Sequence, residues 1–208
     1  PGGYNSTNYA GESYVVFGKA SGFSADLDLS SLNGANGFRL DGVDAWDLSG
    51  RSVSGAGDVN GDGYDDVIIG AYGADPDGQS GAGESYVVFG KSSGFSSSLD
   101  LSSLDGSNGF RLDGVDAGDQ SGYSVSSAGD VNGDGFDDVI IGARFADPDG
   151  KSNAGETYVV FGGKNGWVTE PTYTLSLSGT DADQFEIASD NQLKLKSTIS
   201  ADYEEKDR

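Results

Sequence analysis

Residues 58–66 read Asp58-Val-Asn-Gly-Asp-Gly-Tyr-Asp-Asp66, and the stretch returns with one change as Asp130-Val-Asn-Gly-Asp-Gly-Phe-Asp-Asp138. In each copy, oxygen-bearing side chains occupy the first, third and fifth positions. A glycine follows at the sixth position, where a chain that wraps around an ion needs a residue without a Cβ atom. The stretch therefore predicts a loop that encloses a cation.

The side chains of this loop favour Ca²⁺. The first six residues fit the EF-hand loop template, but that template closes with Glu at position twelve, where this chain has Ile69 and Ile141. We therefore expect the closing carboxylate at position nine. A hard oxygen set without His or Cys suits Ca²⁺ better than Zn²⁺ or Cu²⁺, and flexible carboxylates suit it better than the rigid octahedron of Mg²⁺. The predicted ligands are Asp58, Asn60, Asp62 and Asp66 in the first loop, and Asp130, Asn132, Asp134 and Asp138 in the second.

An alternative is that Asp, Asn and Gly are simply the residues of ordinary turns. A turn needs one or two of them, whereas this pattern sets several in register and does so twice. The repetition favours the cation loop. Asp65 and Asp137, which break the alternation, are predicted to face solvent or to support the ligands indirectly.

The charge of the chain excludes two kinds of partner. Its 208 residues include 34 acidic and 12 basic residues, which gives a net charge of −22. Nucleic acid is not expected as a partner, because few basic side chains are available to neutralise phosphate. No apolar stretch approaches the length of a membrane span, so we expect no direct insertion into a membrane.

The residue types that are missing bear on chemistry. His, Cys and Met are all absent from the sequence. Without a thiol or an imidazole base, most hydrolase and redox mechanisms have no catalytic group here, and we expect that the chain is not an enzyme. A protein outside the cell that lacks disulfides would depend on bound metal instead. The chain opens at Pro1 without an initiator Met, and we expect it to be part of a longer protein.

Self-comparison reveals the organisation of the chain. Residues 10–81 align without a gap on residues 82–153, with 58 of 72 positions identical, and a third copy starts at residue 154. A period of 72 residues is compatible with a four-stranded blade that carries long loops. Short runs rich in Val, Ile, Tyr and Phe predict the strands. For the complete middle blade they are 52–56, 67–71, 84–90 and 110–112.

The remaining strands predict incomplete blades on either side and a separate C-terminal segment. The N-terminal half blade has 14–17 and 38–40, and the third has 124–128, 139–143 and 157–161. A Ser-rich loop, 92–104, offers leucines that could dock as an apolar patch. The texture changes near Pro171, and alternating residues predict strands at 173–179, 185–187 and 192–196. We therefore divide the chain into a repeat region, 1–165, and a short β segment, 166–208.

The motifs around the loop carry a family resemblance. The order Tyr-Val-Val-Phe-Gly, Phe-Arg-Leu-Asp-Gly, Gly-x-Ser-Val and then the cation loop followed by Val-Ile-Ile-Gly-Ala resembles the FG-GAP repeat. This repeat forms the blades of the integrin α-subunit β-propeller and of many bacterial surface proteins. The resemblance implies an all-β fold of propeller-type blades and Ca²⁺ on the outer side of the propeller. It also implies that the seventh residue of each loop, Tyr64 or Phe136, contributes its backbone carbonyl as a ligand.

The C-terminal segment is similar to a truncated cadherin-like repeat, through residues 179–187 and the Asp-Tyr-Glu motif at 202–204. Together the resemblances imply an extracellular, Ca²⁺-binding structural or adhesion module of a large surface or secreted protein, with at least two Ca²⁺ ions. Its partners would be other copies of itself or other surface proteins. An alternative is a subunit of an extracellular filament in which incomplete blades complete each other between chains. A carbohydrate-active enzyme with paired carboxylates is a remote alternative, since the best carboxylates are already assigned to metal.

Overall fold

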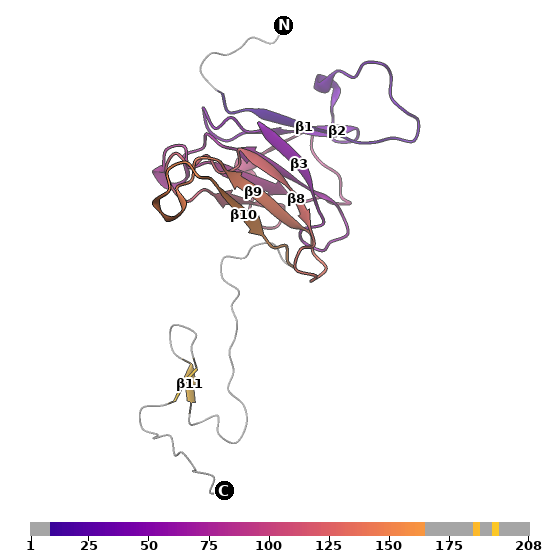
Figure 1. The fold of residues 1–208 in the computed structure, drawn as a ribbon. Helices are drawn as coiled ribbons and strands as arrows, with labels where there is room; N and C mark the ends of the chain where they lie inside the picture. Colours follow the sequence, from indigo (N-terminus) through magenta and orange to yellow (C-terminus); the bar gives the residue numbers. More distant parts are fainter. Residues whose placement is uncertain (1–8, 165–184, 188–192, 196–208) are drawn as a thin grey trace, which may run out of the picture. The chain divides into compact units, whose positions relative to one another are not determined.

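The computed structural model describes residues 9–164 and two short C-terminal strands, 185–187 and 193–195 (Figure 1). The chain forms two compact units, Pro1–Val168 and Thr169–Arg208. In the described residues the regular structure consists of β-strands and four short 3₁₀ helices. These helices are η1 (Leu29–Ser31), η2 (Pro76–Gly78), η3 (Leu101–Ser103) and η4 (Pro148–Gly150). The all-β class expected from the sequence is confirmed.

The middle repeat forms one four-stranded antiparallel sheet. Its strands are β3 (Ser52–Gly57), β4 (Asp66–Ala71), β5 (Glu84–Val88) and β7 (Gly109–Asp113), in that order across the sheet. This is the blade that the sequence predicts. A β-bulge between Gly55 and Gly57 ends the regular register of β3 just before the first cation loop.

The flanking repeats form smaller sheets of the same kind. In the first, β1 (Glu12–Val16) pairs with β2 (Gly37–Asp41); in the third, β9 (Asp138–Ala143) lies between β8 (Ser124–Gly129) and β10 (Glu156–Val160). All pairs are antiparallel, and the strands match the predicted ones within a few residues. The sheets are propeller-type blades that do not close into a ring among the described residues (Figure 1).

Both faces of the middle sheet are buried, as its continuous apolar runs predict. On one face, Ile68 and Val87 pack in a cluster with Val139 of the third blade. On the other, Ile69 and Tyr86 pack in a cluster with residues of the first sheet. Full burial of each such side chain stabilises the fold by about 1.5–3 kcal/mol. Alternation along β4 and β5 therefore joins three blades through two separate cores.

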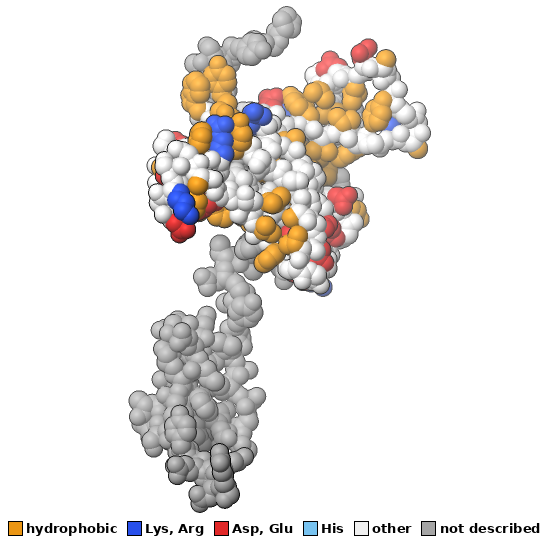
Figure 2. Space-filling view, in the orientation of Figure 1, with side chains coloured by type: hydrophobic (Ala, Val, Ile, Leu, Met, Phe, Trp, Pro, Cys, Tyr) orange, Lys and Arg blue, Asp and Glu red, His pale blue; other side chains and the backbone are white. Residues whose placement is uncertain are grey.

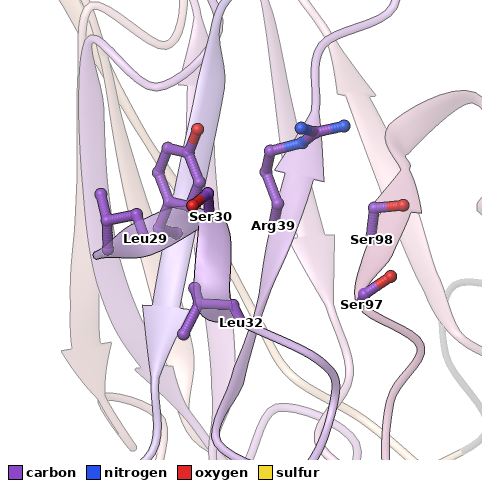
Figure 3. A pocket seen from close by; sticks show the side chains of 7 residues that line it. Leu29, Ser30, Leu32, Arg39, Ser97 and Ser98 are labelled. Carbon is purple, nitrogen blue, oxygen red and sulfur yellow. The ribbon is translucent and has the colours of Figure 1, made fainter. Parts of the chain in front are cut away.

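The Ser-rich segment between β5 and β7 differs from the prediction. It was expected to be a loop, but its residues Ser98–Asp100 form a strand, β6, that pairs in parallel with β2 of the first sheet. Phe95 stacks on Phe38 at 4.1 Å, and Leu101 is buried beside them. The leucines do dock, as predicted, but on the preceding blade. A cavity of about 270 Å³ lies beside this strand and is lined by Tyr14, Leu29, Ser30, Leu32, Arg39, Ser97 and Ser98 (Figure 3).

In the C-terminal unit, β11 (Phe185–Ile187) and β12 (Leu193–Leu195) pair as an antiparallel hairpin. Both strands were predicted from their alternating residues. The strand predicted at 173–179 and the Asp-Tyr-Glu motif lie outside the described residues.

Candidate metal loops

The two cation loops occupy equivalent places in neighbouring blades. Residues 58–66 connect β3 to β4, and residues 130–138 connect β8 to β9. Each loop starts after a glycine with a left-handed backbone, Gly57 (φ 76°) or Gly129 (φ 68°), and ends on the first residue of a buried strand. The loops are therefore anchored at both ends by a sheet.

Asp58 organises the backbone of the first loop. Its Oδ1 accepts hydrogen bonds from the N–H groups of Gly61 (2.8 Å) and Asp62 (3.0 Å), and its Oδ2 accepts one from Gly63 (2.9 Å). Asp130 repeats the arrangement in the second loop with Gly133, Asp134 and Gly135, at 2.7–3.0 Å. One carboxylate thus curls each loop around itself, which is the shape that the alternating pattern predicts.

The third and fifth positions bond to each other. Asn60 Oδ1 accepts from the Asp62 N–H at 2.9 Å, and Asn60 Nδ2 donates to Asp62 Oδ2 at 3.2 Å. Asp62 Oδ1 in turn accepts from the Tyr64 N–H at 2.9 Å. Asn132 and Asp134 form the same contacts in the second loop. The side chains are exposed, so solvent and ions reach their oxygens.

The ninth residue is buried beneath the loop. Asp66 is 1% exposed, and its carboxylate accepts hydrogen bonds from the N–H groups of Val59 (2.9 Å) and Gly90 (2.8 Å). Burial raises the pKa of Asp66 to about 6, and the nearby charges of Asp62 and Asp58 add to the rise. Asp138 is bound in the same way by Val131 and Gly162. This residue ties the loop to the end of the third strand of its own blade.

The structure brings the predicted ligands of each loop onto one short connection, but their carboxylates point at backbone N–H groups. Among the described residues, no group of three or more His, Cys, Asp or Glu side chains converges closely enough to hold a metal ion. The loops do offer a hard oxygen set of three carboxylates and an amide on an ordered backbone. This donor chemistry fits Ca²⁺, and the bond between Asn60 and Asp62 would have to rearrange for both to face an ion.

Sequence reasoning missed one contact at the loops, which crosses from one repeat to the next. The Asp137 carboxylate accepts a hydrogen bond from the Asp58 N–H at 2.9 Å, and the Asp137 N–H donates to the Asp58 carbonyl at 3.1 Å. Asp137 is half-buried. No signal within one repeat could have revealed this contact, because the partners belong to two different blades.

Two further buried acids lie away from the loops. Glu84 accepts a hydrogen bond from the Tyr86 hydroxyl and lies 3.4 Å from the Arg111 guanidinium. Burial raises its pKa, while Tyr86 and Arg111 oppose the rise. Asp47 accepts from the Asp44 N–H, and burial raises its pKa as well. The segment 75–78, considered at first as a second oxygen cluster, includes the 3₁₀ turn η2.

Comparison with protein families fits this geometry. Residues 49–88 and 121–160 match the FG-GAP repeat. Each match covers three strands of a blade and the cation loop between the first two. The FG-GAP part of the resemblance drawn from the sequence is confirmed.

Three relatives show where such repeats occur. The chain is 36% identical over 128 residues to integrin alpha pat-2 of Caenorhabditis briggsae, a match that covers 58% of this chain and 10% of the relative. It is 31% identical over 149 residues to integrin alpha-PS2 of Drosophila melanogaster, which covers 69% and 10%. It is also 32% identical over 124 residues to phosphatidylinositol-glycan-specific phospholipase D of Bos taurus, which covers 59% and 14%.

The chain therefore spans about a tenth of the length of the integrin relatives it matches. In the part of the chain that the structure describes, no helix is long and apolar enough to cross a membrane.

Proposed function

We propose that the chain is an extracellular, adhesion-type module of β-propeller blades in which two Ca²⁺ ions stabilise the connections between strands. The observation that supports this best is the pair of FG-GAP matches, each containing a loop that is already curled around one carboxylate. The integrin relatives support an adhesive, extracellular role. A loop of nine residues costs roughly 1–2 kcal/mol of ordering entropy per residue, and a bound ion offsets part of that cost.

The proposed ligands are the side chains at positions one, three, five and nine of each loop and the carbonyl at position seven. In the first loop they are Asp58, Asn60, Asp62, Tyr64 and Asp66, and in the second Asp130, Asn132, Asp134, Phe136 and Asp138. Bound Ca²⁺ would supply positive charge where three acids are close together. We expect an affinity on the order of 10⁻⁴ to 10⁻³ M, as in other extracellular modules.

Calorimetric titration with CaCl₂ tests the proposal. We expect two ions per chain, a melting temperature that rises with Ca²⁺ concentration, and the loss of one ion in each of Asp58→Ala and Asp130→Ala. Asp65→Ala, an acid in the same loop that is not a proposed ligand, is the matched control and should keep both ions. A melting temperature that ignores both CaCl₂ and chelator would refute the role of Ca²⁺.

We propose that the module acts by binding and not by catalysis. One relative is named as a phospholipase D, but the match covers only 14% of that protein. The chain has no His or Cys to serve as a catalytic base or nucleophile, and its best carboxylates are assigned to Ca²⁺. By the resemblance of residues 179–187 and 202–204, we further propose that the C-terminal segment is the start of a cadherin-like module of a bacterial surface protein.

The exposed faces at the two ends of the repeat region support a second candidate function, self-assembly into a filament. Five apolar side chains are exposed on the first repeat although their counterparts 72 residues later are buried or half-buried against the preceding blade. They are Tyr14, Val16, Phe23, Leu27 and Leu29, which correspond to Tyr86, Val88, Phe95, Leu99 and Leu101. Figure 2 shows hydrophobic side chains on the loop between β1 and β2.

The third blade has the complementary feature. Val159 and Phe161 are exposed, whereas Val87 and Phe89 at the same positions of the middle blade are buried against the third. Each outward face thus copies a face that is buried inside the chain, so the occupant we propose is a second copy of this chain, joined head to tail. Sedimentation at 1 mM CaCl₂ should reveal a concentration-dependent series of oligomers that Leu29→Asp abolishes. Monomers at all concentrations would exclude this candidate.

A further inference from the structure

The two cation loops touch each other through a small set of contacts. Asp137 lies between two proposed ligands of the second loop and exchanges two hydrogen bonds with Asp58, the first residue of the first loop. The Asp58 N–H and carbonyl are both engaged by this one residue. The position of Asp58, whose carboxylate organises the first loop, is therefore set partly by the second loop.

The surrounding packing leaves little freedom for this contact. A Cβ atom on Gly57 would overlap the Asp137 carboxylate, and one on Gly61 would overlap the Phe136 ring. The Gly163 N–H, just beyond β10, donates to the Val59 carbonyl at 2.9 Å. The first loop is thus held against residues 136–137 and 163, and a shift of the second loop cannot occur without moving the first.

The contact runs in one direction only. Asp65 is the counterpart of Asp137 in the first loop, and within the described residues its carboxylate accepts no hydrogen bond from another repeat. The Asp130 N–H, which corresponds to the Asp58 N–H, has no such acceptor in the described part of the chain either. The pair Asp137 and Asp65 therefore provides an internal comparison: the same residue at the same loop position, with and without a partner.

We propose that Asp137 is a positioning residue for the first loop and couples Ca²⁺ binding at the two loops. Binding in the second loop fixes Phe136 and Asp138, and with them the Asp137 that lies between. The Asp137 carboxylate then holds the Asp58 N–H, so less ordering is left for the first loop to do when it binds its own ion. Thermodynamic linkage requires that binding in the first loop strengthen the second by the same factor. This inference rests on the proposed Ca²⁺ sites.

The test follows each loop separately by NMR during titration with CaCl₂. The Gly63 and Gly135 amides donate to Asp58 and Asp130, so each amide signal reports on its own loop. In the unaltered chain we expect the Gly63 signal to titrate at least about fivefold more tightly than in Asp130→Ala, in which the second loop lacks its main carboxylate. Asp137→Ala should weaken the first loop roughly tenfold, because it removes a hydrogen bond to a charged group.

The controls separate positioning from general damage. Asp65→Ala makes the same change of charge at the same loop position and should leave the Gly63 titration within about twofold. Asp137→Asn keeps an oxygen acceptor and should restore most of the affinity lost in Asp137→Ala. In the double variant Asp130→Ala, Asp137→Ala, the two losses should not add, because both remove the same coupling. Circular dichroism without Ca²⁺ checks that each variant is folded.

Two results would overturn the inference and are distinguishable. If both amides titrate with CaCl₂ but Asp137→Ala behaves like Asp65→Ala, the loops bind independently and only the coupling is wrong. If neither amide responds to CaCl₂, the proposed Ca²⁺ sites are wrong, and the coupling is overturned with them.

Discussion

The first and middle repeats carry the same side chains in different surroundings. Tyr14 is 39% exposed and Tyr86 is 1% exposed; Leu29 is 42% exposed and Leu101 is 2% exposed. The middle repeat lies against the half blade of β1 and β2, whereas nothing in the described residues covers the same face of the first. Identical residues therefore have unequal energetic roles, and the neighbouring blade decides which of them form a core.

The largest effect that would test this difference is expected from truncation of the buried leucine. Leu101→Ala should lower the free energy of unfolding by about 3 kcal/mol, because a fully buried leucine leaves both lost burial and a cavity. Leu29→Ala, the same change in the first repeat, should cost less than about 1 kcal/mol. Urea unfolding of the chain monitored by circular dichroism measures both. Equal losses would show that the first repeat is covered in solution.

The strands and most of the fold could be predicted from local sequence. Runs such as Val67–Ala71 are too apolar for anything but a strand covered on both faces, and the repeat period then fixes the blade. β6 could not be predicted, because a Ser-rich segment has little strand propensity of its own. It forms a strand because Phe95 and Leu101 dock on the preceding sheet and bring Ser98–Asp100 beside β2.

The site divides in the same way. The curl of each loop around its first carboxylate and the burial of the ninth residue follow from residue types and spacing. The contact of Asp137 with Asp58 does not, because it depends on how one blade packs against the next. Contacts within a repeat are written in the local pattern, whereas contacts between repeats require the twist and spacing of the blades.

A second effect concerns pH. Burial raises the pKa of Glu84 above its usual value of 4.5, so folding favours its protonated form. Its contribution to stability is therefore greatest at low pH and is lost as pH rises from about 4.5 through the folded pKa. The difference in unfolding free energy between Glu84→Gln and the unaltered chain should increase over that window in favour of the variant. Glu12→Gln, at the exposed equivalent position, is the matched control. A difference that stays constant with pH would contradict the burial effect.

The smallest effect is expected where the repeats differ in sequence. Trp46 has a left-handed backbone (φ 77°) at the position where the middle repeat has Gly118 (φ 90°). The strain of a non-glycine residue there costs about 1–2 kcal/mol. The contact of Trp46 with the Tyr9 ring, at 4.6 Å, stabilises the fold by about 0.5–1.5 kcal/mol, and glycine adds entropy to the unfolded chain.

Because these terms oppose each other, Trp46→Gly should change the free energy of unfolding by less than about 1 kcal/mol. Gly118→Ala, which adds strain where a Cβ has no close neighbour to contact, should destabilise the chain by about 1 kcal/mol. Thermal unfolding of both variants checks this. A loss of several kcal/mol from Trp46→Gly would mean that this exposed tryptophan belongs to a core, which would place a further surface against the first repeat.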